Sequence, residues 1–494
     1  MSEIAGTGLA GPAWLGFLGI LAALGLLVAL AYRGWSVLFL APAAALVAAG
    51  FSGFPLLASW TQIFMPAVAG FIAQFFPLFL LGSIFAKLMN DCGAVGTLAD
   101  SMIARLGQDR AILAVVLAGA ILTYGGVSLF VAFFVLVPMA QALFGVSDIP
   151  RRLVPATVIL GTSTFTMTAL PGSPAIQNVI PMPFFGTTVY AAPGLGLVAA
   201  LIMLTLGLLW LEHASRAATG RGEGYQGPKM PPVDTQRMRE HGSTASTFDP
   251  AEIGHGEPAA GRPKLASAIA PIGVMIGTNL LLSLVVFPTG EAPFLASPEW
   301  GATTLGAVAG IWAVSGALAL AIVTLIAVNR SRIANLRQSI DGGANAAVLP
   351  VLSVASLVGF GAVVAALPAF HAIRDWVMHL GGGPLVSLAV ATNLLAALTG
   401  SASGGLTIAL EALGPTYLRM AAETGVDPAA MHRVAVIGAG TLDILPHNGA
   451  VITLLSLCGV SHRESYRDIA MVGIANSVVA LVAVIVLANL FGAF

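Results

Sequence analysis

Long apolar runs, separated by short polar stretches, repeat along the whole chain. A helix that crosses a bilayer needs about 20 mostly apolar residues. Eight runs meet this requirement without interruption, and each predicts one plain membrane-spanning helix. They cover residues 13–32, 34–52, 66–89, 190–211, 265–286, 302–328, 346–366 and 469–490.

Two further regions, 111–181 and 384–459, are apolar but are interrupted by clusters of Gly, Pro, Ser, Thr and Asn. Each region starts with a short apolar arm and a Gly-rich turn, which predicts a re-entrant helical hairpin. An apolar segment broken at a proline then follows, which predicts a spanning helix that unwinds partway. The hairpins are expected at 111–144 and 384–420, and the broken helices at 153–181 and 434–459.

The spacing of these features indicates two copies of one unit. Gly107 and Pro171 recur as Gly381 and Pro446, at offsets of 274 and 275 residues. An odd number of crossings separates the two copies, so the second is expected to be inverted in the membrane. The predicted fold is an all-α polytopic membrane protein with about 11 transmembrane helices and two re-entrant hairpins.

The chain is expected to have five parts. Residues 1–65 form N-terminal helices, and residues 66–211 form the first inverted repeat. The polar segment 212–264 is a cytoplasmic linker, rich in Gly, Pro and charge and expected to be poorly ordered. Residues 265–345 form further helices and a cytoplasmic loop, and residues 346–494 form the second inverted repeat.

Composition and charge agree with a membrane protein. Apolar residues make up 57% of the chain and charged residues only 9%, against about 25% in soluble domains. With a net charge of −1, nucleic-acid binding and intrinsic disorder are excluded. The two cysteines, Cys92 and Cys458, fit neither a metal site nor a disulfide framework. No metal and no cofactor are expected.

The positive-inside rule orients the chain. If the N-terminus lies outside the cell (inner) membrane, on the periplasmic side, 18 of the 21 Lys and Arg residues fall in cytoplasmic segments. Only Arg374, Arg419 and Arg433 are then expected on the outer side.

The broken helices indicate a function. Backbone that leaves the helix within hydrocarbon survives only where it is buried in protein or lines a watery cavity. Inverted repeats with discontinuous helices are typical of secondary transporters, which bind substrate near the bilayer midplane. Helix N-termini at that point offer free N–H groups and partial positive charge. The expected partner is therefore a small organic anion.

The two hairpin tips supply the first candidate substrate contacts. Their glycines allow close approach, and their hydroxyls and N–H groups suit a carboxylate. The alternative is that these small residues serve only tight helix packing. The candidates are Gly125, Gly126, Val127 and Ser128 at the first tip, and Ser401, Ser403, Gly404 and Thr407 at the second.

The break at Pro171 supplies a second group of candidates. Five hydroxyl residues fall within seven positions, 162–168, of an otherwise apolar span. Some of these hydroxyls are expected to bond back to the i−4 carbonyl instead of facing substrate. The candidates for lining a substrate cavity are Thr164, Thr166, Thr168, Gly172, Ser173 and Asn178.

The break at Pro446 places Asp443, His447 and Asn448 together. An ionisable residue inside a membrane marks a substrate or proton path by default. Asp443 and His447 are therefore the candidates for proton coupling, with His447 and Asn448 also able to contact substrate. The alternative is that Asp443 caps exposed N–H groups and His447 bonds a carbonyl. No Arg or Lys is expected near either break, which favours a monocarboxylate over a multiply charged anion.

At these residues the sequence resembles the gluconate permease (GntP-type) family of carboxylate transporters, within the wider ion-transporter superfamily. The resemblance covers nearly the whole chain. It is carried by FFPLFLLGSIFAKLMNDCGA (75–94), TYGGVSLFVAFFVLVPMAQALF (123–144), IPRRLVPATVILGTSTFTMTALPGSPAIQNVIP (149–181), GSASGGLTIALEALG (400–414) and LDILPHNGAVITLL (442–455).

The resemblance implies proton-coupled symport of a gluconate-like sugar acid or a hydroxy- or monocarboxylate into the cytoplasm. It also implies a homodimer in which a scaffold domain anchors an elevator-type transport domain. The helices without polar breaks, at 13–52, 190–211, 265–328 and 469–490, would then form the scaffold.

The sequence leaves other functions of the same superfamily open. A sodium-coupled carboxylate symporter or a cation/proton antiporter of the same superfamily remains an alternative. The superfamily's sodium symporters carry Ser-Asn-Thr at both tips, which this chain lacks. An enzyme is not expected, because the sequence has no HExxH or GxSxG motif.

Overall fold

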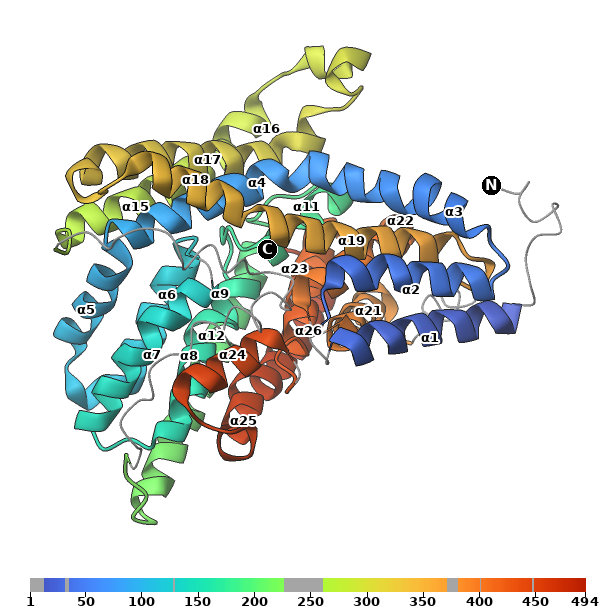
Figure 1. The fold of residues 1–494 in the computed structure, drawn as a ribbon. Coiled ribbons are helices and arrows are strands. Elements are labelled where there is room, and N and C mark those ends of the chain that lie inside the picture. Colours follow the sequence, from blue (N-terminus) through green and yellow to red (C-terminus); the bar gives the residue numbers. More distant parts are fainter. Residues whose placement is uncertain are drawn as a thin grey trace.

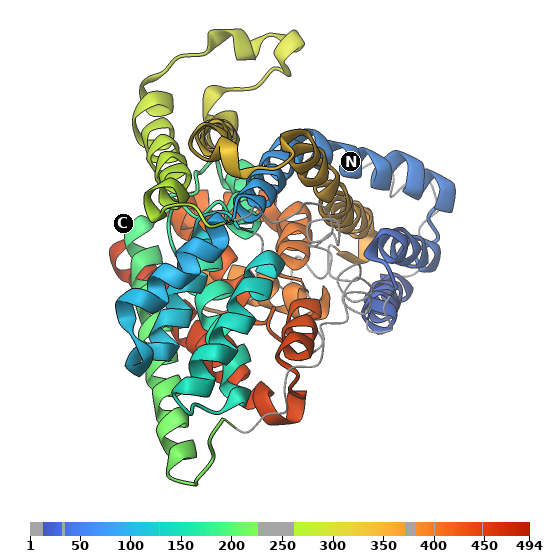
Figure 2. The same cartoon turned by 60° about the vertical axis from the view of Figure 1, so that its left-hand side comes forward.

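The structure, a computed structural model, describes residues 13–31, 35–127, 129–225, 261–370, 381–399, 401–446 and 448–494. These residues are almost entirely helical and contain no β-strand. In Figures 1 and 2 the N-terminal helices and the first hairpin lie at opposite ends of the molecule, and long helices of both halves fill the space between them.

The N-terminal part begins with two apolar helices that pack on each other, α1 and α2. A long continuous helical segment follows, and it includes one π-helical stretch. The bounds are α1 (Ala13–Ala31), α2 (Val37–Phe51), α3 (Leu56–Ala58), η2 (Ser59–Phe64), α4 (Met65–Asp91), α5 (Ala94–Leu106) and η3 (Gln108–Arg110). Helix α5 was not predicted, because its 13 residues are amphipathic and carry too little apolar length to be recognised as a span.

The first interrupted region contains a helical hairpin, as expected. Helices α6 (Ala111–Tyr124) and α7 (Leu129–Val146) pack on each other and on α8. After η4 (Arg151–Leu153), the broken helix consists of α8 (Val154–Thr162), α9 (Phe165–Thr168), α10 (Ile176–Val179) and α11 (Pro181–Phe185), and the long helix α12 (Pro193–Thr219) completes this half.

The middle of the chain pairs two long helices, α15 and α17. Between them, residues 290–304 project from the molecule at the end opposite the C-terminus of α12 (Figures 1 and 2). The bounds are α15 (Leu265–Leu281), η5 (Leu282–Val286), α16 (Phe287–Thr289), η6 (Pro293–Ala296), η7 (Pro298–Trp300), α17 (Leu305–Asn329) and η8 (Arg330–Arg332).

The second interrupted region has the same order of elements. After α18 (Leu336–Ala346) and α19 (Val348–Ala366), the hairpin α21 (Gly383–Thr399) and α22 (Ala402–Thr424) precedes α23 (Pro428–Thr441) and α24 (Gly449–Cys458). Helix α23 begins earlier than expected because Asp427 caps it, accepting a hydrogen bond from Ala429 N. The chain ends with α25 (His462–Ala470), η9 (Met471–Ala475) and α26 (Asn476–Phe491).

Every one of the eight uninterrupted apolar runs is helical along most of its length. In the described residues, six helical segments are long and apolar enough to cross a membrane; α1 and α2 are shorter apolar helices. Large apolar side chains such as Leu57, Leu201 and Leu490 are exposed. Exposure of this kind over several helices is the pattern of a lipid-facing surface.

A glycine allows the two arms of the second hairpin to pack closely. A methyl group added at Gly405 on α22 would collide with the backbone of Ala396 on α21. The two arms therefore approach each other backbone to backbone, as small residues allow in membrane helices.

We predict that Gly405→Ala lowers stability, because the added methyl group must push the hairpin arms apart. Overpacking of this kind costs about 1–3 kcal/mol. Thermal unfolding in detergent measures the loss as a lower Tm. Gly70→Ala is the matched control, since open space surrounds Gly70 in α4. Equal Tm values for the two variants would contradict the close approach.

Candidate functional site

The turn of the first hairpin borders a cavity of about 220 Å³. The walls come from α4, the α6–α7 turn, the segment from α8 to α10, α17 and α19. Gly126, Val127 and Leu129 line it at the turn. Within the described part of the chain, no charged side chain lines this cavity.

The α6–α7 turn brings a helix N-terminus to the cavity wall. Gly126 adopts the left-handed conformation (φ 79°) that ends α6, a conformation that glycine adopts without strain. Helix α7, 18 residues long, starts at the cavity-lining Leu129. The first-turn N–H groups of an α-helix have no partner within the helix. Of the predicted tip residues, Gly126 and Val127 line the cavity, Gly125 does not, and Ser128 lies outside the described residues.

The threonines of the first broken helix are bonded to their own backbone. Thr164 donates to Leu160 O (2.7 Å), and Thr168 donates to Thr164 O (3.0 Å). Thr166 donates to Gly161 O and Thr162 O (3.0 and 3.1 Å). Only Thr166 of the three predicted threonines lines the cavity. Their hydroxyl hydrogens are thus engaged by carbonyls, the alternative that the sequence left open.

Two polar side chains that line the cavity, unlike these threonines, have no hydrogen bond to the described residues. Gln177 on α10 is 8% exposed, and Ser83 lies on α4. Neither side chain makes a hydrogen bond to the described residues. The cavity therefore contains polar groups that are available to a ligand, and neither residue was among the predicted contacts.

A buried arginine contacts the backbone of the first break, next to this cavity. Arg433 of α23 is fully buried and donates to Ala191 O (2.6 Å) and Ala169 O (3.2 Å). Helix α9 ends at Thr168, so the carbonyl of Ala169 lies in the first break. The prediction that no Arg or Lys lies near a break was therefore wrong. The carbonyl oxygens provide the partial negative charge that makes its burial tolerable.

Asn178 joins this arginine to the broken helix. Its side-chain oxygen accepts from Arg433 Nη1 (3.2 Å) and lies 3.2 Å from His432 Nε2, while its amide donates to Ser173 O and Val189 O (3.0 Å each). His432 is also fully buried and bonds Thr187 through Nδ1 (2.7 Å). Asn178, predicted to contact substrate, is thus fully engaged by protein.

Gly172 and Ser173 shape the same break. Gly172 has φ 80° and donates its N–H to Val189 O (2.9 Å). The Ser173 hydroxyl accepts a long bond from Ala175 N (3.4 Å), and Ser173 O accepts from Asn178. Both predicted residues lie in the break, but neither lines the cavity.

The second hairpin tip meets the second break through Asp443. Its Oδ1 accepts hydrogen bonds from Ala402 N (2.7 Å), at the start of α22, and from Asn448 Nδ2 (2.8 Å). Asn448 in turn accepts from Ala450 N and Val451 N, and so caps α24. A carboxylate at a helix N-terminus is favoured by the helix dipole. His447, the other predicted proton carrier, lies outside the described residues.

The hydroxyls of the second tip bond within the tip. Ser401 accepts from Gly404 N (3.2 Å) and lies 3.3 Å from the Ser403 hydroxyl. Thr407 donates to Ser403 O (2.7 Å). The predicted residues of this tip are therefore together, with Asp443 beside them.

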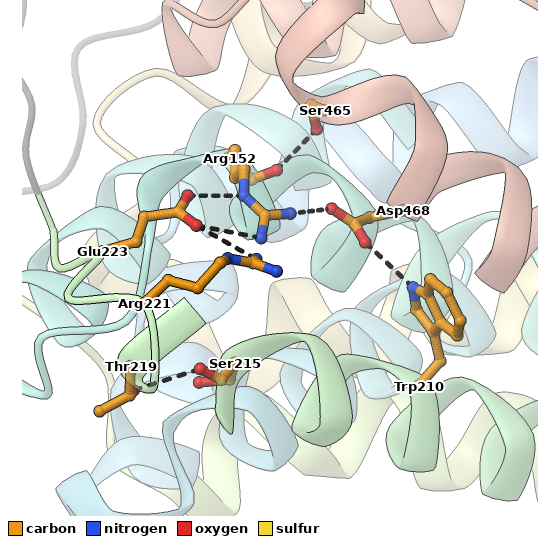
Figure 3. Close-up of polar contacts among 8 residues, drawn as sticks. All are labelled: Arg152, Trp210, Ser215, Thr219, Arg221, Glu223, Ser465 and Asp468. Carbon is orange, nitrogen blue, oxygen red and sulfur yellow. Dashed lines mark hydrogen bonds and ion pairs between the residues drawn. The ribbon is translucent and has the colours of Figure 1, made fainter. Parts of the chain in front are cut away.

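A separate ionic cluster ties the two halves of the chain together (Figure 3). Arg152, just before α8, bonds Glu223 (2.7 Å) beyond α12 and also Asp468 of α25. Trp210 donates to Asp468 (3.1 Å), and Ser465 donates to Arg152 O (2.7 Å). The hydrogen bond from Arg152 lowers the pKa of the Glu223 carboxyl below its usual range.

Apolar helices that are interrupted around an uncharged cavity define a polytopic membrane protein of the transporter class. Residues 15–230 match the family described as GntP family permease. The chain is 42% identical over 481 residues to the uncharacterized transporter YxjC of Bacillus subtilis (strain 168), covering 96% of this chain and 98% of that protein. The chain therefore belongs to the GntP permease family, and the resemblance in the sequence is confirmed.

The fold is also similar to a solved transporter. MtrF of Neisseria gonorrhoeae, described as one of a class of antimetabolite efflux pumps, matches with a TM-score of 0.53 and 15% identity, over 88% of this chain and 84% of MtrF. At this identity the likeness extends to the fold alone.

We predict that Arg433→Met lowers Tm strongly, because the carbonyls of Ala169 and Ala191 lose their buried donor. Each unsatisfied buried group costs about 1–3 kcal/mol. Arg419→Met, at an exposed position of α22, is the matched control and should stay within about 0.5 kcal/mol of the wild type. Similar Tm losses in both variants would refute the structural role of Arg433.

Proposed function

We propose that this GntP-family transporter carries a small organic acid into the cytoplasm together with protons. The substrate would be a gluconate-like sugar acid or a hydroxy- or monocarboxylate. The observation that carries the proposal is the cavity at the start of α7. There, the start of a helix and uncharged polar side chains meet apolar walls, which suits a small anion with an aliphatic body.

The order of helices in the two halves supports inverted repeats. The hairpin α6–α7 followed by α8 corresponds to α21–α22 followed by α23, shifted by about 274 residues. In each half the helix after the hairpin packs against its first arm, α8 on α6 and α23 on α21. Such repeats with discontinuous helices are the architecture of alternating access around a central site.

The chain would sit in the cell (inner) membrane with its N-terminus on the periplasmic side. Residues 290–304 and the end of α12 project at opposite ends of the molecule (Figures 1 and 2), which agrees with a loop and a linker on opposite sides of the membrane. The unbroken helices would form the scaffold of a homodimer, and the hairpins with the broken helices would form the moving transport domain.

A substrate with one carboxylate fits this cavity better than one with several. The lining is uncharged, and Arg433 is already engaged by backbone carbonyls. A second carboxylate would therefore find no cationic partner at the site.

Asp443 is our candidate for the proton carrier. Its carboxylate bonds the first N–H of α22 and the amide of Asn448, so it belongs to both the second hairpin and the second break. Protonation removes its negative charge and weakens its hold on the Ala402 N–H. Proton binding would thereby change how the second hairpin is held, which is the coupling that a symporter needs.

The first test is uptake into proteoliposomes of radiolabelled gluconate and 3-hydroxybutyrate. An inward proton gradient is imposed in one series, and a sodium gradient replaces it in another. We expect concentrative uptake with protons alone. Uptake driven only by sodium would favour the sodium-coupled alternative, and no uptake of either acid would overturn the proposed substrate class.

We predict that Asp443→Asn abolishes proton-driven accumulation but retains exchange of labelled for unlabelled substrate. A side-chain amide cannot take up and release a proton as a carboxylate does. Asp427→Asn is the control, because Asp427 also caps a helix but lies at an exposed position. Full accumulation by the Asp443→Asn protein would exclude Asp443 as the carrier.

A further inference from the structure

Gln177 is the buried polar side chain on the cavity wall that has no protein partner in the described structure. More than nine-tenths of its surface is covered. Its amide atoms keep access to the cavity, where they can bond a ligand. A ligand that covered this amide without bonding it would bind unfavourably. The neighbouring Asn178, by contrast, has its amide donors and its oxygen bonded.

The position of Gln177 is fixed from behind. Helix α10 has four residues, so it cannot hold its orientation alone. Asn178 connects it to Arg433 and His432 of α23. The N–H of Gly172, in the segment just before α10, donates to Val189 O. The Gln177 side chain is thereby presented to the cavity by a rigid support.

The other walls supply what a hydroxylated carboxylate needs. The start of α7 offers N–H groups for the carboxylate. Ser83, on α4, offers a hydroxyl without a partner among the described residues. Leu78, Phe79 and Val314 supply apolar surface for a carbon chain.

We propose that Gln177, with Ser83, forms a hydroxyl-recognising subsite that selects hydroxylated acids over plain aliphatic acids of equal length. This inference rests on the proposed function. An amide both donates and accepts, and so does a substrate hydroxyl. A plain aliphatic acid would leave the amide buried and unpaired, and sites built to bond a hydroxyl reject analogues that lack it for this reason.

The experiment compares gluconate with hexanoate, two six-carbon monocarboxylates that differ in their hydroxyl groups. Binding to the full-length protein in lipid nanodiscs is measured by isothermal titration calorimetry. We expect the wild type to bind gluconate more tightly. Gln177→Leu should weaken gluconate about tenfold, the worth of one neutral hydrogen bond, and leave hexanoate within about twofold. Ser83→Ala should lower the same selectivity ratio by a smaller factor.

Gln62→Leu is the matched control, because Gln62 is exposed on η2 and does not line the cavity. It should change neither affinity. If the wild type binds both acids and neither Gln177→Leu nor Ser83→Ala alters their ratio, the subsite is refuted while carboxylate binding stands. If the wild type binds neither acid, the proposed substrate class and the subsite fall together.

Discussion

The structure depends on one constraint: a helix interrupted within an apolar environment must find partners for the backbone groups that it frees. The two halves of this chain satisfy this constraint with side chains of opposite charge. At the first break, the Arg433 guanidinium donates to the carbonyl of Ala169, at the end of α9, and to that of Ala191, just before α12. At the second, the Asp443 carboxylate accepts from the N–H that begins α22. Each charge thus sits at the helix end whose dipole stabilises it.

These two solutions have different consequences for function. Arg433 is fully buried and is bonded to backbone carbonyls and to Asn178, so it holds α10 in place in the first half. Asp443 can change its charge, so the strength with which it holds the second hairpin depends on whether it is protonated. Arg433 keeps its charge and Asp443 can lose its charge. This difference suits a transporter in which the first half binds the substrate and the second half responds to protons.

The fold could be predicted from the sequence where composition alone decides the outcome. Apolar length located the plain helices, and Gly-Pro clusters located both hairpins and both breaks. What pattern could not supply is the direction of individual side chains. Gln177 and Asn178 are neighbours, yet one lines the cavity and the other is held by protein. Arg433 looked like a surface residue because it lies close to a loop, and only the packing of α23 against distant segments buries it. Asp443 was expected either to cap or to carry a proton, and its residue type cannot separate the two.

The Arg152 cluster has a consequence for how the protein is made. Glu223 lies 71 residues from Arg152 in the chain, whereas Asp468 lies 316 residues away. Chains are synthesised from the N-terminus at about 5–20 residues per second, so Asp468 emerges on the order of tens of seconds after Glu223. During that interval Glu223 can neutralise the guanidinium within the first half. When α25 is synthesised, Asp468 completes the cluster. The ionic contacts of the first half are therefore complete only once the second half has been made.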